Sequence, residues 1–114
     1  MDNLLHVRLR AVDPERKHDR EYKVTLGKDL FGKWYVTIGF GRYGTGGASK
    51  SKLFEERQEA YDFINARLRR RLSSLKRIGC PYRIVSFDGA EEILETMGNK
   101  VIERFSWFRT PRTG

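Results

Sequence analysis

A single stretch of this sequence has the periodicity of a long α-helix, and this limits the folds open to the chain. From Glu55 to Ile78, apolar residues recur every three to four positions, which predicts one amphipathic helix. The apolar stripe consists of Ala60, Phe63, Ile64, Leu68, Leu72, Leu75 and Ile78. A doubly wound parallel sheet needs repeated helical crossovers, so one long helix excludes it. With 114 residues, the chain is predicted to form one domain, residues 1–114.

The residues before this helix alternate between apolar and polar side chains, as in strands that bury one face. The pattern predicts strands at Leu4–Val12, Tyr22–Leu26, Trp34–Phe40 and Ala48–Phe54. The second and third flank a short turn-forming segment, so they are expected to pair as an antiparallel hairpin.

The residues after the helix predict three further elements. Gly79 and Pro81 are typical helix stop signals. A strand is predicted at Tyr82–Phe87, a short helix from Asp88 to Met97 and a strand at Val101–Phe108, and residues 109–114 are expected to form a frayed tail.

Five glycines lie in the segment from Thr37 to Gly47, "TIGFGRYGTGG". Gly39, Gly41 and Gly44 match G-x-G-x-x-G, the spacing of a dinucleotide-binding loop. Such a loop must lead straight into a helix whose N-terminus meets the phosphates, but the predicted helix here begins about ten residues late. We therefore exclude a nucleotide cofactor at this segment.

No group of residues has the spacing of a catalytic or metal site. His6 and His18 have no partner at ligand spacing, and both are interpreted as solvated side chains. Cys80 is the single cysteine and is interpreted as a structural thiol in a reducing compartment. Glu55, Glu56 and Glu59 are interpreted as helix-start residues. We expect no enzyme activity, no metal and no cofactor.

The charge of the chain is strongly positive. The formal net charge is +8, and the excess of lysine and arginine lies within the first 79 residues. This excess suits a polyanionic partner such as nucleic acid, and a surface adapted for solubility explains it equally well. No window is apolar enough for a membrane span and no leader peptide is evident, so we expect a soluble, cytoplasmic protein.

Several motifs occur in the order found in one known family. Phe40-Gly41-Arg42 ends a predicted strand and continues as F-G-R-x-G-T-x-G, with "DREYKVTL" upstream and "LFEERQEAYDFINARLRRRL" downstream. The Tyr82 strand matches the closing motif. Over about residues 4–87 the chain resembles a WGR domain, named for a Trp-Gly-Arg triplet, and residues 88–108 form a C-terminal extension.

The resemblance implies an α+β fold, with a twisted antiparallel β-sheet and one long helix packed across a face. In poly(ADP-ribose) polymerases the WGR domain is non-catalytic and binds DNA breaks at the 5′-phosphorylated end, and bacterial proteins also carry it alone. The triplet Trp falls on Phe40, the triplet Arg on Arg42, and a phosphate-contacting Tyr on Tyr82. A family Asn that helps to hold the 5′ phosphate falls on Asp19, an anion that would repel it.

The first hypothesis is therefore a non-catalytic module that binds nucleic acid, DNA above all. Its site residues are Phe40, Arg42, Tyr82, Lys50 and Lys52, with Gly41, Gly44 and Gly47 as structural glycines. For Arg42, a structural role against the domain's own carboxylates or an interdomain role has about equal weight. The cluster of Arg67, Arg69, Arg70 and Arg71 is interpreted as a solvated helix face. The second hypothesis is a protein-interaction module anchored by Phe105, Trp107 and Phe108, for which core packing is the simpler explanation.

Overall fold

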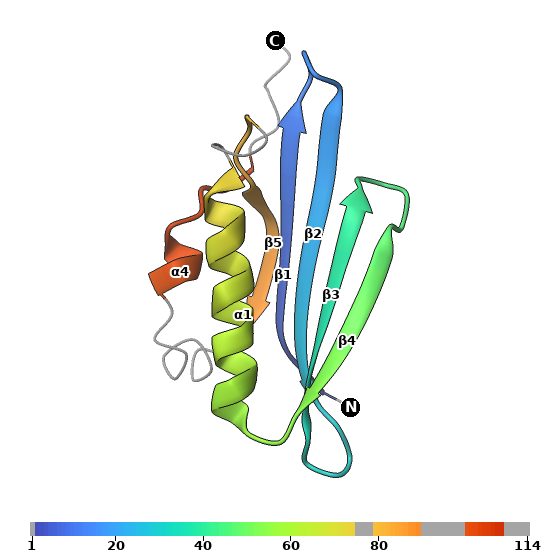
Figure 1. Cartoon of the computed structure of the whole chain (residues 1–114), viewed down its shortest axis with the longest axis vertical. Coiled ribbons are helices and arrows are strands. Elements are labelled where there is room, and N and C mark those ends of the chain that lie inside the picture. The colour runs from blue at the N-terminus through green and yellow to red at the C-terminus, as the bar shows by residue number, and fades with distance from the viewer. Residues whose placement is uncertain (1, 75–78, 90–99, 109–114) are drawn as a thin grey trace.

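The structure, a computed structural model, describes residues 2–74, 79–89 and 100–108. The elements, in chain order, are β1 (Asp2–Asp13), β2 (His18–Lys28), β3 (Trp34–Arg42), β4 (Ala48–Phe54), α1 (Arg57–Leu72), β5 (Arg83–Gly89) and α4 (Lys100–Glu103) (Figure 1). The first four strands lie where the alternating pattern predicts them. The bounds of β4 agree with the prediction, while β1, β2 and β3 are longer than predicted.

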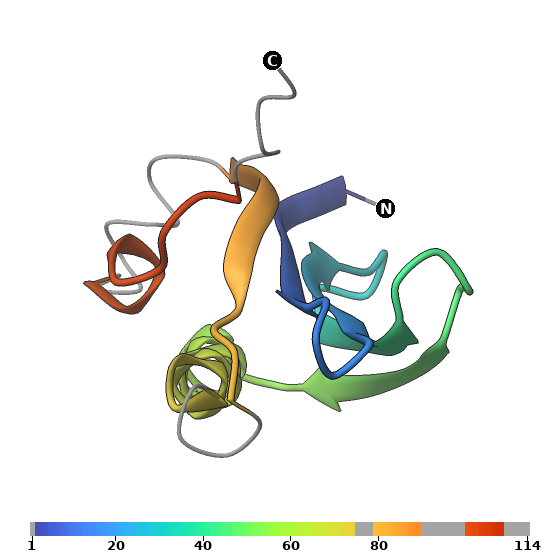
Figure 2. The same ribbon diagram turned by 90° about the horizontal axis from the view of Figure 1, so that it is seen from above.

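The five strands form one sheet in the order β4-β3-β2-β1-β5, and every neighbouring pair is antiparallel. The sheet curves, and α1 lies on its concave side (Figure 2). The expected α+β fold, with an antiparallel sheet and one long helix packed on it, is confirmed.

The core lies between the concave face of the sheet and α1. Alternate residues of β1 are fully buried, as the period-two pattern predicts: Leu5, Val7, Leu9 and Ala11. Across the interface, α1 contributes Ala60, Tyr61, Ile64 and Leu68. Two aromatic pairs join the helix to the sheet, with ring centroids 6.3 Å apart for Trp34 and Tyr61 and 5.3 Å apart for Phe54 and Phe63. This packing fixes which face of α1 is turned toward β3 and β4.

The helix is shorter in the structure than the sequence predicts. It begins at Arg57 with Glu56 as the N-cap residue, so of the three predicted helix-start glutamates only Glu59 lies in its first turn. It ends at Leu72, with Ser73 as the C-cap. Residues 75–78, which include the last part of the predicted apolar stripe, lie outside the described residues.

The strand predicted at Val101–Phe108 is wrong. Residues Lys100–Glu103 form the short helix α4, and only Trp107 forms a β-bridge, parallel to Ile84. The reason is the spacing of the buried residues: Val101, Ile102 and Phe105 lie one and four positions apart, which matches a helical turn rather than a strand. Asp88, placed in a second helix by the prediction, lies in β5, and residues 90–99 lie outside the described residues.

The described helices were also considered as membrane-spanning segments. Within residues 2–74, 79–89 and 100–108, no helix has both the length and the apolar character needed to cross a bilayer.

Candidate functional site

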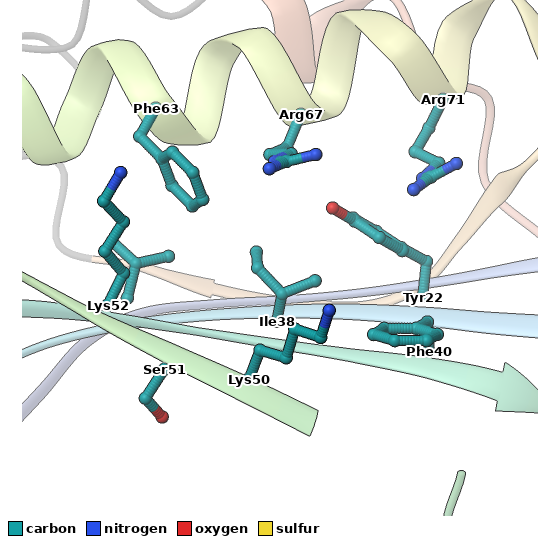
Figure 3. Close-up of a pocket in the computed structure, with 10 residues that line it drawn as sticks. Tyr22, Ile38, Phe40, Lys50, Ser51, Lys52, Phe63, Arg67 and Arg71 are labelled. Carbon is teal, nitrogen blue, oxygen red and sulfur yellow. The ribbon is translucent and has the colours of Figure 1, made fainter. Parts of the chain in front are cut away.

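Two adjoining hollows share Tyr22, Phe40 and Arg71. The first, the helix groove, lies between α1 and strands β3 and β4 and has a volume of about 450 Å³ (Figure 3). It is lined by Tyr22, Val36, Ile38, Phe40, Lys50, Ser51, Lys52, Phe63, Arg67 and Arg71. The second, the strand-end pocket, has a volume of about 430 Å³ and lies where β2 begins and β3 ends. It is lined by Lys17, His18, Asp19, Arg20, Glu21, Tyr22, Phe40, Gly41, Arg42, Arg71 and Tyr82.

Phe40 borders both hollows because of its place near the end of β3. It pairs with Tyr22 of β2 in the sheet register and lies on the same face of β3 as Ile38. Unlike Ile38, it lies beyond the cover of the core, and 41% of its surface is exposed. An aromatic ring with a free face of this kind can stack on a nucleobase.

Arg42 is exposed at the last position of β3. Its backbone is fixed, since its carbonyl accepts hydrogen bonds from the hydroxyl of Thr45 at 2.7 Å and from the N–H of Thr45 at 3.2 Å. Its side chain forms none of the ion pairs found among the described residues. The structural role considered for Arg42, burial against the domain's own carboxylates, is therefore not the arrangement in this structure. Its guanidinium remains available for an external anion.

Asp19 lies in the strand-end pocket, but its charge is balanced by Arg10 of β1. The Arg10 Nη2 lies 2.7 Å from Asp19 Oδ2, and Nε donates to Oδ1 at 2.9 Å. These hydrogen bonds and the charge of Arg10 hold the pKa of Asp19 below its usual value, against the effect of burial, and the charge of Arg42 acts in the same direction. The carboxylate thus stays ionised, and its repulsion of an incoming phosphate is partly offset by a cation.

Tyr82 lies at the inner wall of the strand-end pocket, just before β5. It is buried, and its ring meets that of Tyr22 edge to face with centroids 6.4 Å apart. Burial raises the pKa of Tyr82, and the charges of Arg71 and Arg20 only partly offset this. The pocket therefore has an aromatic inner wall and an exposed arginine, Arg42, at its mouth.

Lys50 and Lys52 lie on β4, the edge strand, and both side chains point into the helix groove (Figure 3). Ser51, between them, points away. The Nζ atom of Lys52 lies 5.4 Å from the ring centroid of Phe63. The predicted placement of both lysines on one face is confirmed by this geometry.

The structure adds residues that the sequence analysis assigned elsewhere. Arg67 and Arg71 of α1 line the helix groove, where the guanidinium carbon of Arg71 lies 4.1 Å from the ring centroid of Tyr22 and that of Arg67 lies 4.9 Å from that of Phe63. Arg69, on the other face of the helix, is exposed and lines neither hollow. The four-residue spacing of Arg67 and Arg71 beside the apolar stripe was the available signal.

The glycines predicted to be structural fall into two kinds. Gly41 and Gly47 let two backbone segments approach closely, because a Cβ on Gly41 would lie 2.8 Å from the Cα of Gly47 and one on Gly47 would overlap the Phe40 carbonyl oxygen. Gly44 has open space around it and is favoured by its φ of 83°. The close approach of Gly41 and Gly47 holds Phe40 and Arg42 at the end of the hairpin.

Of the residues considered for chemistry, Cys80 and His6 line neither hollow. His18 lines the strand-end pocket, and its Nδ1 is buried without a hydrogen-bond partner among the described residues rather than solvated as expected. Cys80 is buried, and burial raises the pKa of its thiol. His6 lies within hydrogen-bond distance of the Thr25 hydroxyl, at 3.2 Å. Within the part of the chain that the structure describes, no three histidine, cysteine or acidic residues are grouped as metal ligands. The two hollows present aromatic faces and cations, and the strand-end pocket also contains His18, Asp19 and Glu21.

Comparison with known proteins gives one match. The sequence model of a family described as the WGR domain matches residues 5–74 of the chain, which is more than half of its length. No curated protein and no solved structure matches the chain. The matched residues run from β1 to just beyond α1, so Tyr82, β5 and α4 lie outside the match.

Proposed function

Since the chain belongs to the WGR domain family, we propose that it is a non-catalytic module that binds nucleic acid, with DNA backbone or DNA ends as the preferred target. Phe40, Arg42 and Tyr82 come from β3 and from the segment before β5, yet all three line the strand-end pocket. This convergence of an exposed aromatic ring and an exposed arginine is the observation that carries the proposal.

Each residue has a distinct part in the proposed contact. Arg42 presents a planar fork of donors that suits the oxygens of one phosphate group. Phe40 offers its exposed ring to a base at the end of the strand. Lys50 and Lys52 extend the positive surface along β4, so the next phosphates of the backbone meet further cations.

The pocket also sets a limit on the specificity of this contact. Asp19 remains ionised beside the site, and Arg10 is already engaged with it. The protein should accordingly bind ends with and without a 5′ phosphate about equally well. The readout is of backbone and strand ends rather than of base sequence, because these contacts do not reach base edges.

A salt titration tests the proposal directly. A fluorescent blunt duplex is titrated with the protein at several salt concentrations, and the affinity should fall steeply as salt rises because phosphate contacts release counterions. Arg42→Ala should weaken binding uniformly across sequences and make the salt dependence shallower by about one phosphate contact. Arg69→Ala is the matched control, since Arg69 is an exposed arginine that lines neither hollow.

Two results of this titration would contradict the proposal. If duplexes of either end chemistry fail to bind at low salt, the proposal is wrong. If Arg42→Ala and Arg69→Ala weaken binding equally, the attraction is due to net charge alone and the strand-end pocket is not the site.

A second candidate function rests on Trp107, which has 56% of its surface exposed beside β5. An exposed tryptophan is a favourable anchor for a protein partner. Replacing Trp107 by serine distinguishes the two candidates, because it should leave nucleic-acid binding intact and abolish binding to a protein partner.

A further inference from the structure

The helix groove differs in character from the strand-end pocket. It is a slot between a helix and a sheet, with Ile38 and Phe40 of β3 on the sheet side and Phe63 of α1 on the helix side (Figure 3). Its rim carries cations from both sides. We propose that this groove holds one unpaired nucleotide at the end of the nucleic-acid strand, an inference that rests on the proposed function and adds its substrate class.

The first observation is the charge on the two walls. Lys50 and Lys52 of β4 face Arg67 and Arg71 of α1 across the groove (Figure 3). None of the four takes part in an ion pair among the described residues. Like charges that face one another repel, so an anion between the walls would stabilise the arrangement. The ligand should therefore carry at least one phosphate.

The second observation is a pair of polar atoms without partners at the inner end of the groove. Tyr22 is only 1% exposed, and its hydroxyl points into the groove, where it has no hydrogen-bond partner among the described residues. The Nε atom of Arg71, whose guanidinium lies over the Tyr22 ring, is likewise buried without one. Buried polar groups are nearly always satisfied, so these two donors indicate where a polar ligand atom would sit.

The third observation concerns size and shape. A hollow of about 450 Å³ is in the range of sites that hold a single small molecule. The bases of a duplex are paired and stacked on their neighbours, whereas one splayed base is free to stack on aromatic side chains such as Phe40 and Phe63. Phe40 lines both hollows, so a strand whose phosphate is held at Arg42 can continue past Phe40 into the groove.

The test compares two duplexes that differ only at one end. One is blunt and the other carries an overhang of a few unpaired nucleotides, and both are titrated with the full chain by fluorescence anisotropy. The overhang should bind about tenfold more tightly, in line with the contribution of one stacked base. A fluorescent base analogue in the overhang should also change its emission when it stacks in the groove.

Two variants locate the effect. Arg67→Gln removes one wall charge from the surface of α1, and Tyr22→Phe removes only the unpartnered hydroxyl. In each of these two variants, the ratio of the overhang affinity to the blunt-end affinity should fall several-fold toward one. Arg69→Gln is the control and should leave the ratio unchanged. Thermal unfolding of each variant verifies that it is folded, and Arg67→Gln alone suffices if Tyr22→Phe is not.

Each result decides the matter. Equal binding of the two duplexes would overturn the inference while leaving the proposed function standing, and failure of both to bind at low salt would end both. Free deoxyadenosine monophosphate, titrated while amide shifts are followed, distinguishes the source of the nucleotide. If it binds at micromolar concentration and the overhang gives no advantage, the groove is a site for free nucleotides and the inference of a strand end is wrong.

Discussion

Arg10 binds both carboxylate oxygens of Asp19, with its Nη2 2.7 Å from Oδ2 and its Nε 2.9 Å from Oδ1. The same guanidinium lies 3.7 Å from the ring centroid of Tyr43, so it joins β1, β2 and the loop after β3. The resemblance to the WGR family implies that Asp19 stands in place of an asparagine that helps to hold a 5′ phosphate. Under the proposed function, this ion pair should determine how the strand-end pocket discriminates between phosphorylated and unphosphorylated ends.

We predict that Asp19→Asn gives the protein a preference for 5′-phosphorylated ends. The substitution removes one negative charge from the pocket and frees Arg10, so a phosphate gains an attraction of roughly 1 kcal/mol, or about fivefold in affinity. Anisotropy with 5′-phosphate and 5′-hydroxyl duplexes measures the ratio, which should be near one for the unaltered protein. Loss of the ion pair should also lower the free energy of unfolding by about 1 kcal/mol. An unchanged ratio in the variant would show that Asp19 does not control this choice.

The stability of the domain at acid pH should depend on two carboxylates of β2, those of Asp19 and Glu21. Arg10 lowers the pKa of Asp19. Burial acts to raise the pKa of Glu21, but Arg8 and Lys23 outweigh burial, so the pKa of Glu21 is also lowered. A depressed pKa in the folded state means that each carboxylate contributes stability above its unfolded pKa, which is near 4.

That contribution is lost as the pH falls through the folded pKa, so the free energy of unfolding should decrease below about pH 4. Chemical denaturation across pH 2–7 measures this, and Asp19→Asn and Glu21→Gln should each make the decrease shallower. A decrease of unaltered slope in both variants would contradict the contribution assigned to these two carboxylates.

The glycines of the β3–β4 connection should differ in their tolerance of a methyl group. Gly47→Ala places a Cβ against the carbonyl oxygen of Phe40 and also carries a positive φ of 58°, so we expect a loss of about 2 kcal/mol or more and weaker nucleic-acid binding as Phe40 shifts. Gly44→Ala has only the conformational cost, about 1 kcal/mol, because no atom lies within 4 Å of the added carbon. Thermal melts and anisotropy distinguish them, and equal losses of binding would contradict the role assigned to the Gly41–Gly47 contact.

Local patterns were sufficient to predict the first four strands, the presence of the long helix and the face on which several site residues lie. Alternation placed Lys50 and Lys52 on one face of β4, and the triplet placed Phe40 and Arg42 at the end of β3, where the structure has them. These features depend only on neighbours in the chain. The error at Val101–Phe108 was also local, because the strand period was assigned where Val101 and Phe105 are buried with the spacing of a helical turn.

Tertiary relationships could not be predicted in the same way. Arg71 enters the groove because of the rotation of α1 about its own axis relative to β3 and β4. The apolar stripe defines this rotation only to within about one residue. The partner of Asp19 depends on the register of β1 and β2, in which Asp19 lies opposite Val12, and Arg10 reaches it diagonally. For that reason the sequence indicated a repulsive anion where the structure has an ion pair.

The two aromatic residues Phe105 and Trp107, which follow α4, should differ in how much their substitution lowers the free energy of unfolding. Phe105 is 7% exposed and packs in the core, so Phe105→Ala should lower the free energy of unfolding by about 3 kcal/mol. Trp107 is mostly exposed, and the backbone hydrogen bonds of its bridge to Ile84 are made by Ser106 and Phe108, so Trp107→Ser should cost less than about 1 kcal/mol. Urea denaturation measures both. If Trp107→Ser destabilises the fold as much as Phe105→Ala, the indole is a core residue in solution and the protein-interaction surface built on it is excluded.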